Sequence, residues 1–160
     1  MFAACGGDKA ANTPTDTTAA VDAAVPAAAA DAPANVASGP SGEEVYARCI
    51  ACHQANSVGV PGAFPPLAAS EWVTGPASRP IAILLHGLQG EISVAGVKYN
   101  SMMMAYGTGV PMSDAEIASV LTYVRSNFGN SASAVTADEV AKVRAATASR
   151  TTPMTQKDLE

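Results

Sequence analysis

Apolar residues recur along this chain at the spacing of short amphipathic helices. The pattern predicts helices over residues 42–52, 79–86 and 113–128, and a Ser-x-x-Glu capping pattern opens the last of them. Residues 91–98 instead carry Ile and Val on both sides of an Ala-Gly pair, which favours a small hairpin. Five Gly and Pro residues make residues 54–70 an irregular loop. The pattern therefore predicts a mostly helical domain over residues 42–130.

The segment before this domain, residues 1–41, has a different composition. It consists mostly of Ala, Thr, Asp and Pro, and its recurring prolines oppose a long helix. We expect a disordered linker here. Its r.m.s. reach would be on the order of 30 Å if it behaves as a flexible coil.

Residues 131–160 follow the domain as a C-terminal extension. A capping-box pattern at Thr136 predicts one further short helix that ends near Ser149. Its apolar stripe is weak, so such a helix is ordered only when it packs against its own domain or a partner. Because an already complete domain precedes it, we expect this helix to dock the chain onto a partner complex.

The segment Cys49-Ile50-Ala51-Cys52-His53 carries the most specific chemistry. Residues at i, i+3 and i+4 share one face of a helical turn, so both cysteines can form thioethers with a porphyrin while His53 faces its iron. The alternatives are a reactive dithiol and part of a zinc site. A closed zinc site needs four ligands, and Cys5 and His86 stand alone. A thioredoxin-like dithiol would need a βαβ pattern. The motif therefore predicts one covalent c-type haem.

Size and charge agree with a small cofactor-binding domain. A core of about ninety residues buries little surface, and a haem commonly supplements such a core. The whole chain has 160 residues, a formal net charge of −5 and only 14% charged residues. No basic patch is evident, so nucleic-acid binding is excluded.

Cys5 needs its own explanation, because the haem would use the other two thiols. Phe2-Ala3-Ala4-Cys5-Gly6-Gly7 resembles a bacterial lipoprotein processing site, which implies a lipid anchor on Cys5. Phe2 departs from the usual aliphatic residue, and no basic or apolar leader precedes it, so we expect a truncated start. No apolar run is long enough to span a bilayer. These features predict a protein anchored in the periplasm or at the outer face of the cytoplasmic membrane.

The order of elements and the haem motif make residues 42–130 resemble a class I bacterial cytochrome c. The resemblance implies an all-α fold with short helices around one covalent haem. Residues 99–106, Tyr-Asn-Ser-Met-Met-Met-Ala-Tyr, occupy the place of the family's Tyr-Asn-Gly-x-Met-Pro-x-aromatic segment. This alignment selects Met103 as the second axial iron ligand. Met104 stands where the family has proline, so Met102 and Met104 stay as alternatives.

A second family segment lies between the haem motif and these methionines. Phe64-Pro65-Pro66-Leu67 resembles the family's Pro-x-Leu segment, which implies that the Pro65 carbonyl accepts a hydrogen bond from His53 and that Leu67 touches the porphyrin. Such a bond fixes the imidazole ring and strengthens it as a donor.

Other residues resemble structural positions of the same family. Gly42 and Tyr46 in the first helix and Tyr123 in the last resemble the helix crossing of these cytochromes. We expect His86 to end a helix rather than bind iron. The Trp72 indole is expected either to bind a haem propionate or simply to pack.

These assignments imply an electron carrier rather than an enzyme. With both axial positions filled by protein, the iron has no open site for a substrate. Redox proteins would dock at the thioether edge of the haem, with little electrostatic attraction because Lys98 is the only lysine of the domain. The C-terminal helix slightly favours the haem-bearing subunit of a membrane-associated respiratory or dehydrogenase complex. The alternative is a lipid-tethered periplasmic electron shuttle.

Overall fold

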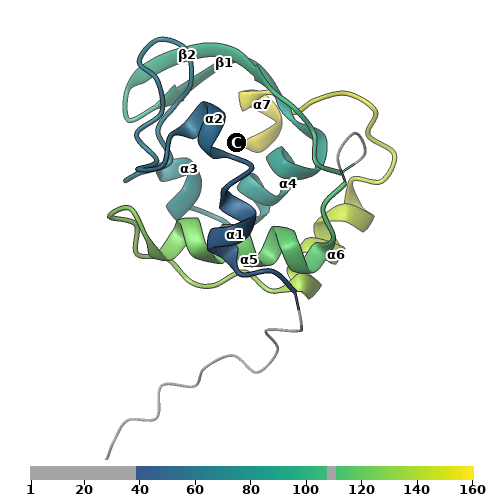
Figure 1. Ribbon diagram of the computed structural model, residues 1–160. Coiled ribbons are helices and arrows are strands. Elements are labelled where there is room, and N and C mark those ends of the chain that lie inside the picture. Colours follow the sequence, from purple (N-terminus) through teal and green to yellow (C-terminus); the bar gives the residue numbers. More distant parts are fainter. Residues whose placement is uncertain (1–38, 108–110) are drawn as a thin grey trace, which may run out of the picture. The chain divides into compact units, whose positions relative to one another are not determined.

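The computed structural model describes residues 39–107 and 111–160 (Figure 1). In these ranges the chain forms short helices and one two-stranded antiparallel sheet. In chain order the elements are α1 (Gly42–Tyr46), α2 (Ile50–His53), α3 (Glu71–Thr74), α4 (Ser78–His86), β1 (Leu88–Val94), β2 (Val97–Met103), α5 (Asp114–Ser126), α6 (Ala137–Ala146) and α7 (Gln156–Leu159). The mostly helical fold class is confirmed, with the small sheet as an addition.

Two predictions lie outside the described residues: the linker before residue 39 and the lipid anchor on Cys5. Among the helices of residues 39–107 and 111–160, none combines the length and the apolar character that crossing a bilayer requires.

The crossing of α1 and α5 forms the centre of the main core. A Cβ atom on Gly42 would lie 2.3 Å from the Ser119 carbonyl oxygen, so only glycine allows the two helices to approach this closely. Tyr46 and Tyr123 stack beside the crossing, with ring centroids 5.7 Å apart. The predicted apolar stripe of α5 is buried here: Ile117, Val120, Leu121 and Val124. The expected helix crossing is confirmed.

The expected continuous helix over residues 42–52 is wrong, because it breaks between α1 and α2. The amides of Arg48 and Cys49 bond to carbonyls three residues back, at 3.1 and 2.8 Å. Such i to i−3 bonds tighten the turn. The break lets α2 leave the direction of α1, and it places Cys49 directly before the first residue of α2.

The predicted hairpin exists and is longer than expected. Its turn is Ala95-Gly96, where both residues have positive φ (49° and 76°), as a tight hairpin turn requires. The strands pair in register from Val94 with Val97 to Leu88 with Met103. Because β2 runs through Met103, strand alternation determines which methionines face inward.

The C-terminal extension packs against its own domain. Helix α6 lies against α4 and α5, and its Val140 is fully buried in the main core (Figure 1). Further along, Met154 forms a parallel bridge with Leu88, joined by the bond from the Gln89 amide to the Met154 carbonyl at 2.9 Å. The prediction that this helix uses its apolar face to dock a partner is therefore wrong.

Val140 offers a direct test of this packing. Val140→Ala should lower the free energy of unfolding by roughly 1–3 kcal/mol, because it leaves a cavity in the main core. The matched control on the exposed side of the same helix is Lys142→Ala, which should change it by less than about 0.5 kcal/mol. Chemical denaturation followed through the haem absorbance measures both. Equal stabilities would mean that α6 contributes nothing to the core.

Candidate functional site

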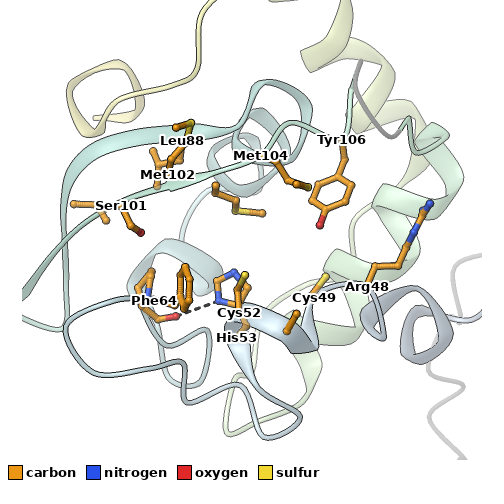
Figure 2. A pocket seen from close by; sticks show the side chains of 14 residues that line it. Arg48, Cys49, Cys52, His53, Phe64, Leu88, Ser101, Met102, Met104 and Tyr106 are labelled. Atoms are coloured by element: carbon orange, nitrogen blue, oxygen red, sulfur yellow. Dashed lines mark hydrogen bonds between the residues drawn. The ribbon is translucent and has the colours of Figure 1, made fainter.

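The haem motif forms one helical turn. The amides of Cys52 and His53 both bond to the Cys49 carbonyl, at 3.2 and 2.9 Å, which closes the turn and brings the three side chains together. Cys49 is half-buried, Cys52 is exposed and His53 is only 7% exposed. Figure 2 shows the three side chains along one wall of a cavity. The motif therefore presents one imidazole to the interior and two sulfurs near the surface.

Two adjoining cavities meet at this wall. The larger has a volume of about 430 Å³ and the smaller about 80 Å³. Three residues line both: Cys49, His53 and Met103. The other walls of the larger cavity come from the Phe64-Pro65 loop and from the hairpin, at Leu88 and Ile92 among others (Figure 2). A mostly apolar space bounded by an imidazole, a thioether and two thiols fits a haem that is bonded to the chain.

The predicted partner of the histidine is in place. His53 Nδ1 lies 3.1 Å from the Pro65 carbonyl oxygen. A carbonyl oxygen only accepts, so Nδ1 carries the hydrogen and Nε2 keeps its lone pair for a metal. Burial lowers the pKa of His53, although the Pro65 bond opposes this, so the imidazole is neutral at neutral pH. Leu67 lines the smaller cavity, beside the same ring.

The cysteines do not have the character of a redox dithiol. Burial raises the pKa of the Cys49 thiol to about 11, so it stays protonated at neutral pH, whereas a reactive cysteine needs a lowered pKa. Cys49 and Cys52 are both free thiols. Within the part of the chain that the structure describes, no three His, Cys, Asp or Glu side chains gather as a metal cluster. Neither the dithiol nor the zinc alternative gains support.

Strand alternation separates the three candidate methionines. Met102 and Met104 are 69% and 60% exposed, and they reach only the rim of the larger cavity. Met103 is half-buried, packs against both hydrophobic clusters of the core and lines both cavities. Of the three thioethers, that of Met103 is therefore the one placed at the centre of the site.

Two other sequence candidates serve the framework. The His86 Nε2 atom lies 2.7 Å from the Thr147 hydroxyl oxygen, and His86 lines neither cavity. The Trp72 indole donates to the Ser93 carbonyl at 2.7 Å, so its hydrogen is already used, while its ring lines the smaller cavity. Trp72 therefore packs at the site and ties it to the hairpin.

The sequence prediction missed much of the apolar lining. Leu88 and Ile92 of β1 contact the larger cavity, as does Tyr106, which the sequence marks only as an aromatic of the methionine segment. Spacing within β1 could have suggested that Leu88 and Ile92 share a face, but only once the strand was known to begin at residue 88.

Gly59 controls the position of the Pro65 carbonyl. A Cβ atom on Gly59 would lie 2.3 Å from the Phe64 carbonyl oxygen and 2.7 Å from that of Pro65. Gly59 also has a φ of 67°, in the left-handed region. The loop thus returns against a bare Cα atom, and this close approach brings the Pro65 carbonyl to the His53 ring.

Gly59→Ala should therefore displace the carbonyl that holds the histidine. Gly62 is a matched control, because its φ is 75° but nothing lies within 4 Å of an added Cβ. Gly62→Ala should cost only the left-handed backbone strain, about 1–2 kcal/mol. Gly59→Ala should cost about 2 kcal/mol more, because it adds a steric clash. Unfolding of the two holoproteins measures the difference, and similar losses would contradict the close approach.

Comparison with known proteins places this geometry in a family. Residues 40–128 match the family model described as "Cytochrome c". The chain is 42% identical over 113 residues to "Cytochrome c-552" of Thermus thermophilus, which covers 65% of this chain and 84% of that protein. A second "Cytochrome c-552", from another strain of T. thermophilus, is also 42% identical over 113 residues and is covered to 74%.

A more distant relative is the "Fructose dehydrogenase cytochrome subunit" of Gluconobacter japonicus. It is 32% identical over 102 residues, which is 61% of this chain but only 20% of that protein. The family model spans the haem motif, the Pro65 loop and the methionine segment, the three parts that meet at the cavities. The chain therefore belongs to the cytochrome c family, whose members carry covalent haem c and transfer electrons.

Proposed function

We propose that this protein is a single-haem electron carrier in which His53 and Met103 are the axial iron ligands and Cys49 and Cys52 form the thioethers. The observation that carries the assignment is that His53 and Met103 line both cavities, one from the helical wall and one from the hairpin. Bound haem c supplies a one-electron ferric/ferrous couple. The protein's part is to fix both ligands and to keep water out.

The two ligands act on the reduction potential in opposite directions. A methionine thioether favours ferrous iron and raises the potential. The bond from His53 to the Pro65 carbonyl makes the imidazole a stronger donor, which favours ferric iron. Because protein groups fill both axial positions, no coordination site is left for a substrate. This supports a carrier without its own catalytic reaction.

Electrons would enter and leave at the edge nearest Cys52. Ile50, Ala51 and Cys52 are exposed there, and Met102 and Met104 are exposed on the hairpin side of the larger cavity. This rim is apolar and carries little charge. It suits brief contacts with redox protein partners that depend weakly on ionic strength.

For the cellular setting, we infer a lipid-tethered shuttle in the periplasm or at the outer face of the cytoplasmic membrane. The tether is the lipid that the sequence predicts on Cys5. The burial of α6 supports a mobile carrier, because the helix expected to dock a complex spends its apolar face on its own domain. The similarity to a dehydrogenase cytochrome subunit supports the second candidate, a fixed haem subunit of a membrane-associated respiratory or dehydrogenase complex.

Substitution of the three methionines tests the ligand assignment. Met103→Ala should abolish the sulfur-to-ferric-iron charge-transfer band and lower the reduction potential, because the thioether ligand is lost. Met102→Ala and Met104→Ala are matched controls on the same segment, and both should keep the band. Optical spectra of the oxidised proteins and redox titration measure these effects. A band that survives in Met103→Ala and disappears in a control variant moves the ligand.

Cys5 tests the tether. In a host that exports and lipidates the protein, the wild type should be recovered with membranes and Cys5→Ser in the soluble periplasmic fraction, because only the former carries acyl chains. Both should have the same haem spectrum. Mass spectrometry of the N-terminus identifies the lipid, and an unmodified Cys5 in membrane-extracted protein would exclude it.

Gentle detergent extraction of the native membranes separates the shuttle from the subunit. A shuttle should be recovered alone after size-exclusion chromatography. Recovery within a larger complex, at a fixed ratio to other subunits, would instead support the second candidate.

A further inference from the structure

The loop that presents the Pro65 carbonyl is tied to α1 by two buried hydroxyl groups. The Tyr46 hydroxyl donates to the Gln54 carbonyl at 2.8 Å, and the Ser57 hydroxyl lies within hydrogen-bond distance of the same phenol oxygen. Since a carbonyl only accepts, Tyr46 uses its one hydrogen on Gln54, and Ser57 must donate to Tyr46. Both hydrogens have a partner, so the chain of bonds runs from Ser57 through Tyr46 to Gln54.

Ser57 also holds the far end of the loop. Its carbonyl accepts from the Leu67 amide at 2.8 Å and from the Ala68 amide at 3.0 Å. Ser57 is fully buried, so water cannot replace these bonds. Pro65 stands two residues before Leu67, and its position therefore follows from that of Ser57.

The residues after α5 secure the same segment from the other side. Asn130, which follows α5, donates to the Leu67 carbonyl at 3.0 Å and to the Val124 carbonyl at 2.8 Å. The loop is thus fixed to both helices of the crossing, at α1 by Tyr46 and at α5 by Asn130.

Packing alone does not require the Tyr46 hydroxyl. The Tyr46 ring contacts the rings of Tyr123 and Phe128, with centroids 5.7 and 5.2 Å apart, and a phenylalanine would make the same contacts. A buried hydroxyl costs free energy unless it is hydrogen-bonded. Burial raises the pKa of Tyr46, so the phenol keeps its hydrogen. What the hydroxyl contributes is the position of the loop.

We propose that Tyr46 and Ser57 are positioning residues for the His53–Pro65 hydrogen bond and that, through it, they lower the reduction potential of the haem. The proposal rests on His53 as an axial ligand. Without the Tyr46 hydroxyl, the Gln54 carbonyl and the Ser57 hydroxyl lose their partner and the loop gains freedom. The Pro65 carbonyl then holds the imidazole hydrogen less firmly, the imidazole donates less to the iron, and the ferrous state is favoured.

The test is Tyr46→Phe in the holoprotein. At a fixed ambient potential, the ratio of reduced to oxidised protein should rise roughly two- to fivefold, which is the range expected when one hydrogen bond weakens. The His53 Nδ1 proton, followed by NMR, should shift and exchange faster with solvent. The methionine charge-transfer band should remain, because the hairpin is not touched.

Tyr123→Phe is the matched control. Tyr123 lies in the same aromatic cluster, and its hydroxyl makes no hydrogen bond to any residue that the structure describes. Its removal should leave the potential and the Nδ1 proton unchanged. Ser57→Ala removes only the donor to Tyr46 and keeps the bond from Tyr46 to Gln54. It should shift both readouts in the same direction by less, and it serves if Tyr46→Phe does not retain haem.

A merely structural role for the hydroxyls predicts a different result. Tyr46→Phe would then lose stability, yet its potential and its Nδ1 proton would match those of Tyr123→Phe, and this outcome overturns the proposal. Failure of the ligand assignment is seen separately, because the wild type itself would then lack the His53 Nδ1 signal or the methionine band.

Discussion

The hydrogen bond from His53 Nδ1 to the Pro65 carbonyl is the contact on which the architecture of this protein converges. It fixes the tautomer and the direction of one ring, and both are needed before Nε2 can bind iron. To make it, the chain must turn back on itself directly after α2. Gly59 permits that return, because any side chain there would strike the Phe64 and Pro65 carbonyls. The helix crossing at α1 and α5 then supplies the fixed points to which the returning loop is tied.

The opposite wall is built by a different kind of force. Met103 is directed inward by the pleat of β2 and held by apolar contacts with both hydrophobic clusters. The hairpin in turn rests on the C-terminal extension, since Met154 pairs with Leu88 and the Ser93 amide bonds to the Gln156 side chain at 2.9 Å. The extension therefore belongs to the structure that positions the methionine, and the cytochrome core does not end at residue 130.

Local chemistry predicted the parts of the site, and tertiary packing decided the rest. The Cys-x-x-Cys-His spacing and the Pro65 and Met103 segments could be identified because each role needs a particular residue type at a particular spacing. The break between α1 and α2 could not, because residues 42–52 have continuous helical periodicity and only the i to i−3 bonds at Arg48 and Cys49 interrupt it. The burial of α6 was also hidden, since its apolar stripe is weak and Val140 alone is fully enclosed. Capping patterns mark where a helix begins and not what it packs against.

The two walls of the site consequently control different properties of the iron. Hydrogen bonds are directional, so the loop side can set how strongly the imidazole donates. Apolar packing is not directional, so the hairpin side sets how deeply the thioether lies and how well water is excluded, without a polar group of its own on the sulfur. Among the described residues that line the cavities, the polar support is concentrated around His53. A change in potential at constant ligands should therefore come from the loop that follows α2, and it is there, at buried hydroxyls that packing does not require, that this chain differs from a purely apolar cradle.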